Sequence, residues 1–588
     1  MKIVLPKEMR GTTFSQALSL ELNGFDVDHF LPTFFFKALA DGLQAGQRPN
    51  DPEAIGKYIS KLASHPDIRI EEPDRYKTLE RLVRTELIEV GTVGQQRRGE
   101  QIITVTPYTI LSHKVGLPKA GSRQRGVDSF LYQAMLGSCG GTNFEAREML
   151  KEYLKRVFAK GVIINPPPQL GGYYDGTTAL DTMTRLSLAF LDGFDATPVG
   201  KRESRTLLAS ACPLLAQMLG EDLLRYLFFF GDKMPTQALT YNFQALISFE
   251  LFVYTLKHVT ALNQLVQTPE ILPAAMCDDM EPSPPDIYLD FTNEPHSLSQ
   301  EMARSCVRRD IESYQRYLGT ILLLRLLDGY VGKFKRTKAK EIEAALDGAA
   351  SGPHYLQGLL ELLHHPQFEG LFETRAQDDE DKILDATKAA ISSGAKGDKS
   401  ADDADDSDSD TNPRAYFDEI AQGATTNIER VAKLLTEAQQ KEGLRHYAAW
   451  FWGVGGLTKP YGILAGTLKG RQSWHYAPSN DLLAVLVQLA TVAIPSEEGA
   501  KMPAAQQRIN PKEQKAEPVR LQEFLDYLHT RFGILINRPP APYSGAEAAS
   551  AARDNLRAML ARLRQMGVFS DLSDDFTVQE LRPPYTGA

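Results

Sequence analysis

The chain has 588 residues, of which 43% are hydrophobic and 24% are charged, with a net charge of -10 and four cysteines. This length allows about three or four domains, each with its own core, and the composition excludes a disordered chain and a small disulfide-stabilised scaffold. The longest apolar runs, 223–231 and 320–327, are shorter than the ~18–20 residues that cross a membrane, and the first residues lack the apolar region of a signal peptide. We therefore expect a cytoplasmic protein with no membrane partner.

Residues 1–126 carry the element order of a winged helix. Three helical runs begin at about Thr33, Asp51 and Asp74, and the two aspartates are expected to be N-caps. Two runs rich in β-branched residues, 90–93 and 101–106, then enclose a turn bounded by glycine, which predicts a β-hairpin. Three helices followed by a hairpin predict a winged-helix-like domain.

Basic residues of the third helix and of the hairpin turn are the predicted DNA contacts. At 100° per residue, the basic residues of the helix fall on the face opposite Tyr76, Leu79 and Val83. Residues 74–126 contain ten Lys or Arg against five acidic residues, and clustered positive charge of this kind favours phosphate binding. The alternative is an ordinary solvated helix face. The expected contacts with double-stranded DNA are Lys77, Arg81, Arg84, Arg97 and Arg98.

Residues 127–375 are predicted to form a helical core domain, because amphipathic runs follow one another between glycine and proline breaks. A short extended run, 287–291, precedes a long helix expected from about Ser299 to Val331. Asp290 ends the extended run, so a metal-dependent nuclease using this carboxylate is one alternative. The cysteines and histidines have no metal-ligand spacing and no phosphate-binding or dinucleotide motif occurs, so we expect neither a metal nor a cofactor.

Residues 376–412 are predicted to form an acidic, disordered linker. From 378 to 412 there are 12 acidic residues against four lysines, a balance of -8. The second half of this segment has no large apolar residue with which to offset the entropy of ordering. A solvated spacer is the usual role of such a run, and an acidic tail that binds a basic partner is the alternative.

Residues 413–588 are predicted to form a helical domain that ends in a second winged-helix-like module. Leu521 to Phe532 and Leu556 to Leu563 are apolar helical stripes that stop at Gly533 and Gly567, and two short strands follow the second stripe. Arg553, Arg557 and Arg564 share one edge of the last helix and are further candidate DNA contacts. From 519 to the end there are eight arginines against eight acidic residues, so this module is as well suited to bind protein as DNA.

The segments KPYGILAGTLKGRQSWHYAPSNDLLAVLVQLA, RFGILINRPP and LRAMLARLRQMGVFSDLSDDFTVQELRPPY carry a family resemblance. This part of the chain, roughly the last 140 residues, resembles subunits encoded in bacterial multi-gene anti-phage operons, such as the methylation-associated defence system. That system pairs a DNA methyltransferase with ATPase and nuclease-like partners. The resemblance implies a role in defence against foreign DNA beside other subunits of the same operon, and it transfers no active-site residue.

The sequence therefore predicts a mainly α, multidomain protein with winged-helix-like modules near both ends of a helical core. The expected function is that of a non-catalytic DNA-binding or adaptor subunit of a restriction-like anti-phage complex. Two alternatives remain at this point. One is a nuclease subunit that uses Asp290, and the other is a scaffold that contacts only protein.

Overall fold

Helix α8, Thr236–Gln267, lies at the centre of the fold and is buried on every side. Its apolar residues surround the whole helix instead of forming one stripe, and such a helix is stable only inside a core or a membrane. Among the described residues it is the one helix with the length and mean hydropathy of a membrane span, yet 94% of its apolar window is buried within the protein. Its environment is therefore that of a core helix.

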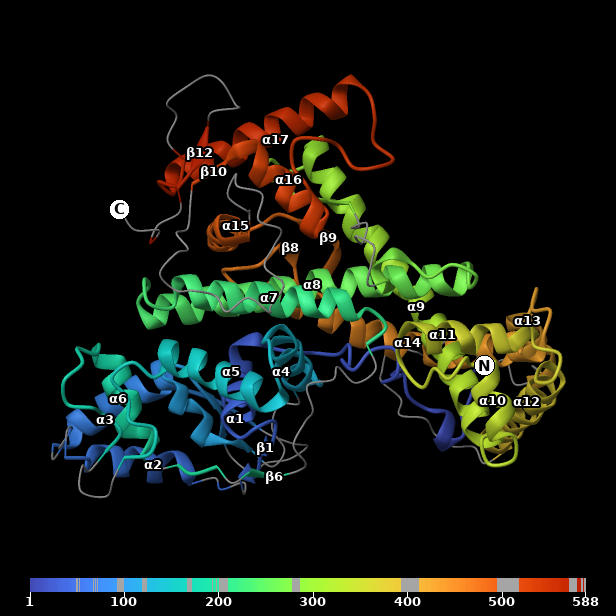
Figure 1. The fold of residues 1–588 in the computed structure, drawn as a ribbon, viewed down its shortest axis with the longest axis horizontal. Helices are drawn as coiled ribbons and strands as arrows, with labels where there is room; N and C mark the ends of the chain where they lie inside the picture. The colour runs from blue at the N-terminus through green and yellow to red at the C-terminus, as the bar shows by residue number, and fades with distance from the viewer. Residues whose placement is uncertain are drawn as a thin grey trace.

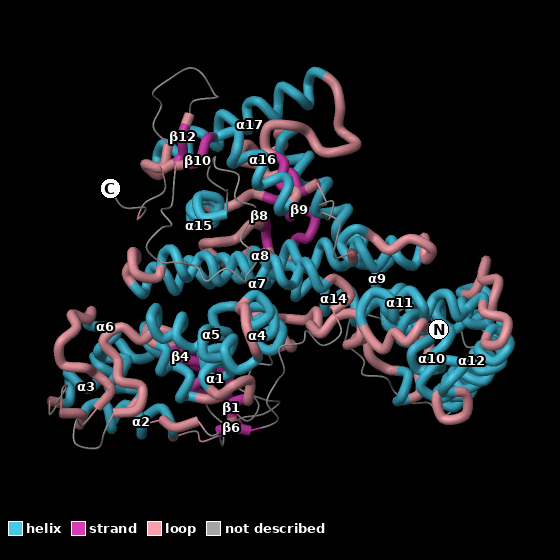
Figure 2. The backbone as a smooth tube through the Cα atoms, viewed as in Figure 1, coloured by secondary structure: helices cyan, strands magenta, loops and turns pink. Residues whose placement is uncertain are grey.

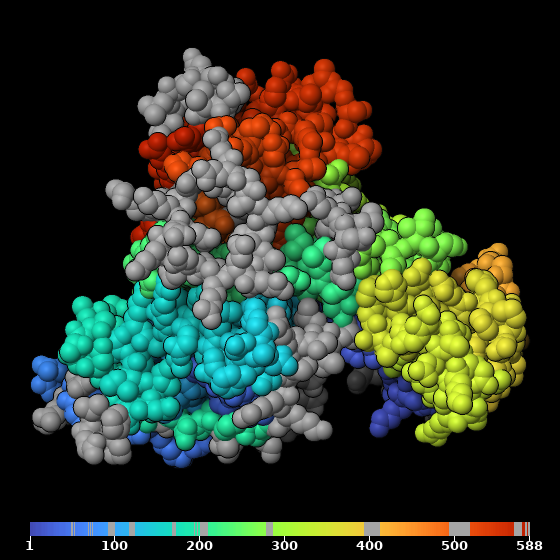
Figure 3. Space-filling model, viewed as in Figure 1, coloured from blue at the N-terminus to red at the C-terminus, as the bar shows by residue number. Residues whose placement is uncertain are grey.

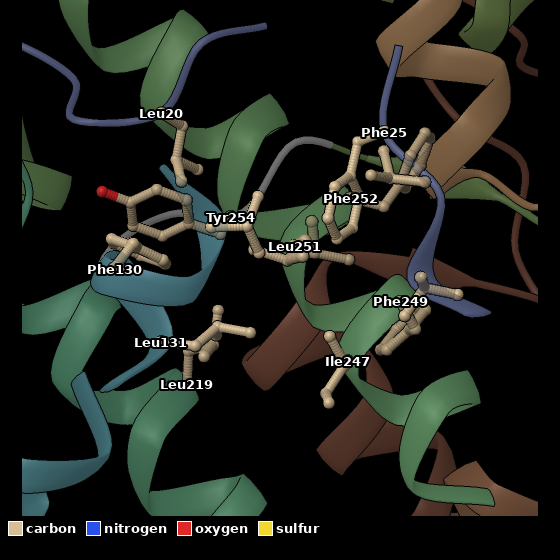
Figure 4. Packing of buried hydrophobic residues seen from close by; sticks show 14 of the residues in the cluster. Leu20, Phe25, Phe130, Leu131, Leu219, Ile247, Phe249, Leu251, Phe252 and Tyr254 are labelled. Atoms are coloured by element: carbon tan, nitrogen blue, oxygen red, sulfur yellow. The ribbon is translucent and has the colours of Figure 1, made fainter. Parts of the chain in front are cut away.

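The rings of α8 pack against residues from distant parts of the chain (Figure 4). Their ring partners come from an early helix and from two helices near the C-terminus, with centroid separations of 4.8 to 5.1 Å. Phe–Phe and Phe–Tyr contacts at such distances contribute stability beyond the area that they bury. The three ring pairs are Phe130–Tyr254, Phe249–Phe532 and Phe252–Phe451.

The computed structural model is mainly helical, and Figure 2 shows that its strands form only small sheets between helices. Figure 3 shows the N-terminal residues, the residues between about 340 and 440, and the C-terminal residues as three masses around the central helices. The structure describes the whole chain except residues 49–50, 52, 67, 69, 71, 93–99, 119–123, 167–171, 193, 197, 200–209, 278–285, 393–411, 494–517, 570–578, 583–584 and 586–588.

The N-terminal lobe lies on one side of α8 and consists of six helices and six strands among its described residues. The helices are α1 Phe30–Leu39, α2 Ala54–Ala63, α3 Pro73–Leu82, α4 Val127–Ser138, α5 Asn143–Phe158 and α6 Thr182–Leu191. The strands are β1 Gln44–Ala45, β2 Gln47–Arg48, β3 Ile88–Thr92, β4 Glu100–Val105, β5 Leu117–Pro118 and β6 Pro198–Val199. Strands β3 and β4 form the expected antiparallel hairpin, while β1 pairs with β6 and β2 with β5.

Helices α2 and α3 do not begin at the N-cap residues that the sequence predicts. Helix α2 begins at Ala54, and the Asp51 carboxylate instead accepts the N–H of Glu53 at 3.0 Å and binds Lys57 at 2.8 Å. Helix α3 begins at Pro73, so Asp74 lies inside the first turn. A proline is favourable at the first helical position, because a backbone N–H at that position would have no partner within the helix. With Pro73 in this position, the helix starts one residue before the aspartate.

Three long helices connect the lobes, namely α7 Pro213–Phe230, α8, and α9 Leu298–Phe334. Helix α9 confirms the expected long helix and runs from the core into the second lobe, where the other helices are α10 Ala339–Ala345, α11 Gly352–Glu361, α12 Glu369–Ser392, α13 Pro413–Ile420 and α14 Asn427–Val454. The N-terminal residues pack on this second lobe: the N–H of Val4 donates to Thr387 at 3.1 Å and that of Gly11 to Gln439 at 2.8 Å. The division of the chain into segments at 126 and 375 stays a prediction.

The first part of the expected acidic linker is helical, which corrects its start at residue 376. Residues 376–392 are the second half of α12, whose inner face buries Ile383 and Leu384. Two of the acidic residues are also buried: Asp379 binds Arg375 at 3.0 Å, and Glu380 binds Arg430 at 2.9 Å. The charge count of the segment missed both pairs, because Arg375 lies just before its predicted start and Arg430 lies 50 residues after Glu380. The expected disordered part, 394–412, lies outside the described residues except for Asn412, the N-cap of α13.

The C-terminal lobe covers the opposite side of α8. It contains β7 Ile287–Tyr288 from the middle of the chain, β8 Leu464–Thr467, β9 Gly470–Tyr476, α15 Asn480–Ala493, β10 Val519–Arg520, α16 Leu521–Phe532, β11 Ile534–Leu535, α17 Ala546–Gln565 and β12 Glu580–Leu581. The expected apolar stripe of α16 is buried, and Gly533 ends the helix with a φ of 77°. Strand β12 pairs with β10, and its Leu581 also bridges Phe569.

A buried ion network fixes α16 to the core. The Arg531 guanidinium lies 2.7 Å from the Asp222 carboxylate of α7 and 3.8 Å from the Glu250 carboxylate of α8, and all three side chains are less than 10% exposed. Burial raises the pKa of Glu250 well above its usual range, while the nearby Arg531 charge opposes that shift. Burial also lowers the pKa of Lys257, which donates to the Arg531 carbonyl, to about 7.

Arg531→Met is expected to lower the free energy of unfolding by about 3–5 kcal/mol near pH 7, because it leaves the Asp222 charge buried without its cation. Arg538→Met, a change at an exposed arginine of the same lobe, is the matched control and is expected to have an effect within about 0.5 kcal/mol. Denaturant unfolding followed by circular dichroism measures both. Adding Asp222→Asn to Arg531→Met removes the uncompensated charge and is expected to recover part of the loss. Equal stability of the two arginine variants would contradict this role of Arg531.

Candidate functional site

The basic face of α3 is the first candidate interface. Leu79 and Val83 on its opposite side are 5% and 0% exposed, so the helix packs as the sequence pattern predicts. A π-helical turn, Val83–Leu87, joins α3 directly to β3, and this short connection fixes the helix relative to the hairpin.

Lys77 and Arg81 lie one turn apart on the exposed side of α3. The Lys77 side chain is 72% exposed, and its nearest acidic partner is Asp74 at 3.7 Å, itself 97% exposed. A contact of this length between exposed groups contributes little, so the ammonium group is free to turn toward a phosphate. These two cations are therefore accessible to a large polyanion.

Arg84 has a different environment. Its guanidinium donates to Glu80 at 3.1 Å and to Glu100, the first residue of β4, at 2.7 Å. The hydrogen bond that Arg84 donates to Glu100 is the main reason that the pKa of Arg84 is raised, with Glu80 adding to it against the effect of burial. Two carboxylates therefore compensate this cation, and its contacts tie α3 to the hairpin. Arg97 and Arg98 lie outside the described residues.

The hairpin is also anchored to the N-terminal chain through His29. The His29 imidazole makes a hydrogen bond to the Glu89 carboxylate of β3 and lies 4.0 Å from Asp26. Burial alone would lower the pKa of His29, but Glu89 and Asp26 outweigh it and raise the pKa above its usual value. This contact favours the charged imidazolium and holds the base of the hairpin in place.

The last helix, α17, carries the second group of predicted contacts on its outer flank. Arg553 is exposed, Arg557 donates to Asp554 at 2.7 Å, and the Arg564 guanidinium lies 5.3 Å from the centre of the Phe569 ring. These three residues share the expected edge. Arg564 packs over Phe569, just after the helix, so Arg553 and Arg557 are the more available pair.

The inner face of α17 holds two side chains whose long-range contacts the sequence pattern did not reveal. Asn555 is fully buried; its amide donates to the carbonyl of Leu289 at 2.7 Å, and its oxygen accepts the N–H of Phe291 at 2.6 Å. Arg562 donates to the Phe291 carbonyl at 2.9 Å, and burial lowers its pKa. Their partners are more than 250 residues away in sequence, and no local pattern signals such a pairing.

Asp290 lies in the segment that α17 holds, and its environment is structural. Its Oδ1 accepts hydrogen bonds from the N–H of Thr292 at 3.1 Å, from the Thr292 hydroxyl at 2.8 Å and from the Ser299 hydroxyl at 2.7 Å. Two acidic residues of the following helix, α9, have partners of their own: Glu301 pairs with Arg304 and Arg308, and Asp310 with Arg309 and Tyr476. Among the described residues, no three His, Cys, Asp or Glu side chains are grouped so as to hold a metal ion.

Asp290→Ala is expected to lower the free energy of unfolding by about 3 kcal/mol, because it removes a buried acceptor from three donors. Glu294→Ala, at an exposed acid of the same loop, is expected to change stability by less than about 0.5 kcal/mol. Thermal and denaturant melts of both variants measure the difference. An Asp290→Ala protein with wild-type stability would show that the carboxylate has no structural role and would return attention to the nuclease hypothesis.

The comparisons with known proteins extend the resemblance seen in the last 140 residues. No curated protein and no solved structure matches the chain. One family model matches residues 7–585, which is nearly the whole chain, and its description is methylation-associated defense system protein MAD7. The match covers both candidate interfaces, the central helices and the second lobe. The chain therefore belongs to the MAD7 family of methylation-associated defence system proteins.

Proposed function

We propose that the protein is a non-catalytic DNA-binding and adaptor subunit of a methylation-associated anti-phage complex. The role in defence is supported by the membership of the chain in the MAD7 family. The observation that supports DNA contact is the exposed pair Lys77 and Arg81 on a helix that is rigidly joined to a hairpin. Such a face suits the phosphate backbone, where most of the affinity of DNA-binding proteins originates.

The element order at both ends of the chain supports winged-helix-like modules. At the N-terminal end, α1, β1, β2, α2, α3 and the β3–β4 hairpin follow one another, and Arg48 of β2 donates to the Ile102 carbonyl of β4 at 2.7 Å. At the C-terminal end, α15, β10, α16, β11 and α17 are followed by Phe569 and β12, and β12 lies between β10 and Phe569. Each module has three helices with short strands between them and a small sheet near its end.

The two modules differ in charge, and this supports a division of roles. Residues 74–126 of the N-terminal module contain ten Lys or Arg against five acidic residues, whereas from residue 519 onward arginines and acidic residues are equal in number. A surface without net charge gains little electrostatic free energy from DNA phosphates and is better suited to contact another protein. We therefore assign DNA contact to the N-terminal module and contact with other subunits to the outer flank of α17. The pure scaffold is the second candidate, and it requires that the α3 face bind no DNA.

Lys77→Ala with Arg81→Ala is expected to weaken binding to duplex DNA similarly on all sequences and to reduce the slope of log K against log salt by about 2, at roughly 0.9 per lost phosphate contact. Both side chains are exposed, so the fold is expected to stay intact. Lys335→Ala with Arg336→Ala removes two exposed cations from the end of α9, far from the hairpin, and is the matched control. Gel-shift titrations at several salt concentrations measure both pairs. Equal affinity and slope in the two double variants would favour the scaffold.

Arg553→Ala with Arg557→Ala is expected to reduce co-purification of the other operon products while leaving the salt slope of DNA binding unchanged, because these exposed side chains lie on the neutral module. Affinity purification of the tagged full-length chain from its native operon measures the first effect, and the gel-shift series measures the second. The Lys77/Arg81 variant is the reciprocal control and is expected to retain its partners. A loss of DNA affinity with normal co-purification would reverse the assignment of the two modules.

A further inference from the structure

A cavity of about 270 Å³ lies in the second lobe, away from both candidate interfaces. Helices α9, α12 and α14 and the N-terminal residues Glu8 and Met9 form its walls. In Figure 1 these helices surround the N-terminus of the chain at the right of the molecule. The volume is near the lower end of the range for small-molecule sites, so an occupant would be no larger than a small metabolite.

The charged groups of this cavity have a surplus of cations. Arg325, Lys333, Arg375 and Lys382 line it, with Glu8 and Asp379 as the only carboxylates among its lining residues. Arg375 and Lys382 share Asp379, at 3.0 and 2.7 Å, and Arg375 also lies 3.6 Å from the carboxylate of Asp378, which does not line the cavity. The Arg325 guanidinium donates to backbone carbonyls of residues 8–11, which leaves its charge uncompensated by a carboxylate.

Lys333 makes no ion pair within the described part of the chain, although its ammonium group interacts with cations and carboxylates of the cavity. Burial lowers its pKa, and the positive charges of Arg375 and Lys382 lower it further against the opposing charges of Asp379 and Glu8. Bringing like charges together is unfavourable unless an anion joins them. The surplus of two positive charges matches a phosphate monoester, which carries about -1.5 to -2 near pH 7.

One polar atom at the cavity, the Nε of Arg375, is buried and has no hydrogen-bond partner among the described residues. The hydroxyl of Tyr330, a side chain that is 2% exposed, interacts with the Asp379 carboxylate. Burial raises the pKa of the Tyr330 hydroxyl, and Asp379 raises it further, so the group keeps its proton and can donate. Buried donors are nearly always paired in native proteins, so the Arg375 Nε calls for a partner that is an acceptor.

The remaining wall is apolar. Met9, Leu322, Leu326 and Leu435 face the same space as the cations. A ligand that is only an anion would leave this apolar wall in contact with water. A ligand with a flat ring would cover the wall, and the burial of apolar surface would add to its binding free energy. We propose that this cavity binds a nucleoside monophosphate, with the phosphate at Lys333, Arg375 and Lys382 and the base on the leucine wall. This site is independent of the proposed DNA contact.

The glycines of α9 supply a blocking variant and its control. Gly329 lines the cavity, and a Cβ at this position would meet nothing within 4 Å, so Gly329→Phe fills the site without displacing the protein. Gly332 has the same open space but does not line the cavity, and Gly332→Phe is the matched control. Both changes replace glycine inside a helix by a better helix former, so both proteins are expected to fold.

Isothermal titration of the full-length protein with AMP, GMP, CMP and UMP tests the proposal, with adenosine and inorganic phosphate as partial ligands. We expect micromolar binding of the monophosphates, with purines ahead of pyrimidines, and at least about tenfold weaker binding of adenosine and of phosphate. Lys333→Ala is expected to weaken binding at least about tenfold, and Gly329→Phe to abolish it, while Lys335→Ala and Gly332→Phe bind as the wild type does.

Three results would overturn the proposal. One is the absence of binding by all four monophosphates at millimolar concentration. Another is binding of inorganic phosphate as tight as that of the monophosphates, which would leave the apolar wall without a role. The third is unchanged binding by the Gly329→Phe or the Lys333→Ala protein, which would place the ligand elsewhere. Because no DNA is present in these titrations, their outcome is separate from the test of the α3 face.

Discussion

The burial of α8 on every side is the constraint on which the rest of the fold depends. A helix with apolar residues around its whole circumference needs packing partners in all directions. The N-terminal lobe supplies Phe130, the end of α14 supplies Phe451, and α16 supplies Phe532. Segments that are hundreds of residues apart therefore meet on one helix, and each lobe is placed relative to the others through it.

Charged groups inside this core make the placement of α16 specific. Arg531 has its partner Asp222 on α7 and lies near Glu250 on α8, and burying the charge of Arg531 or of Asp222 alone would be strongly unfavourable. Apolar contacts alone tolerate small shifts of a helix, whereas an ion network in a low-dielectric interior requires one arrangement. The same principle acts where Asn555 of α17 binds both sides of the segment 289–291, which brings the middle of the chain into the C-terminal lobe.

The candidate interfaces are formed by the helix faces that do not pack on this core. On α3 and α17 the apolar side faces inward and the basic side faces outward, so a rigid scaffold presents cations at fixed positions. Not every basic residue on these faces is available. Arg84 joins α3 to the hairpin and Arg564 packs over Phe569, so each contributes to local structure. The cavity of the second lobe shows the reverse situation, with several cations gathered around too few carboxylates.

The sequence by itself determined the elements whose signals are local. The apolar stripes of α3 and α16, the hairpin β3–β4, the stop of α16 at Gly533 and the long helix α9 all follow from spacing and turn chemistry within a few residues. Tertiary structure alone decided which charged residues are paired and which are free. Residues 376–392 looked like part of a solvated acidic spacer, but Arg430 and the apolar face of α12 bury Glu380. Asp290 looked like a candidate metal ligand, but Thr292 and Ser299 occupy one oxygen of its carboxylate. The Glu380–Arg430 pair joins residues 50 positions apart on two helices, and no local pattern contains it.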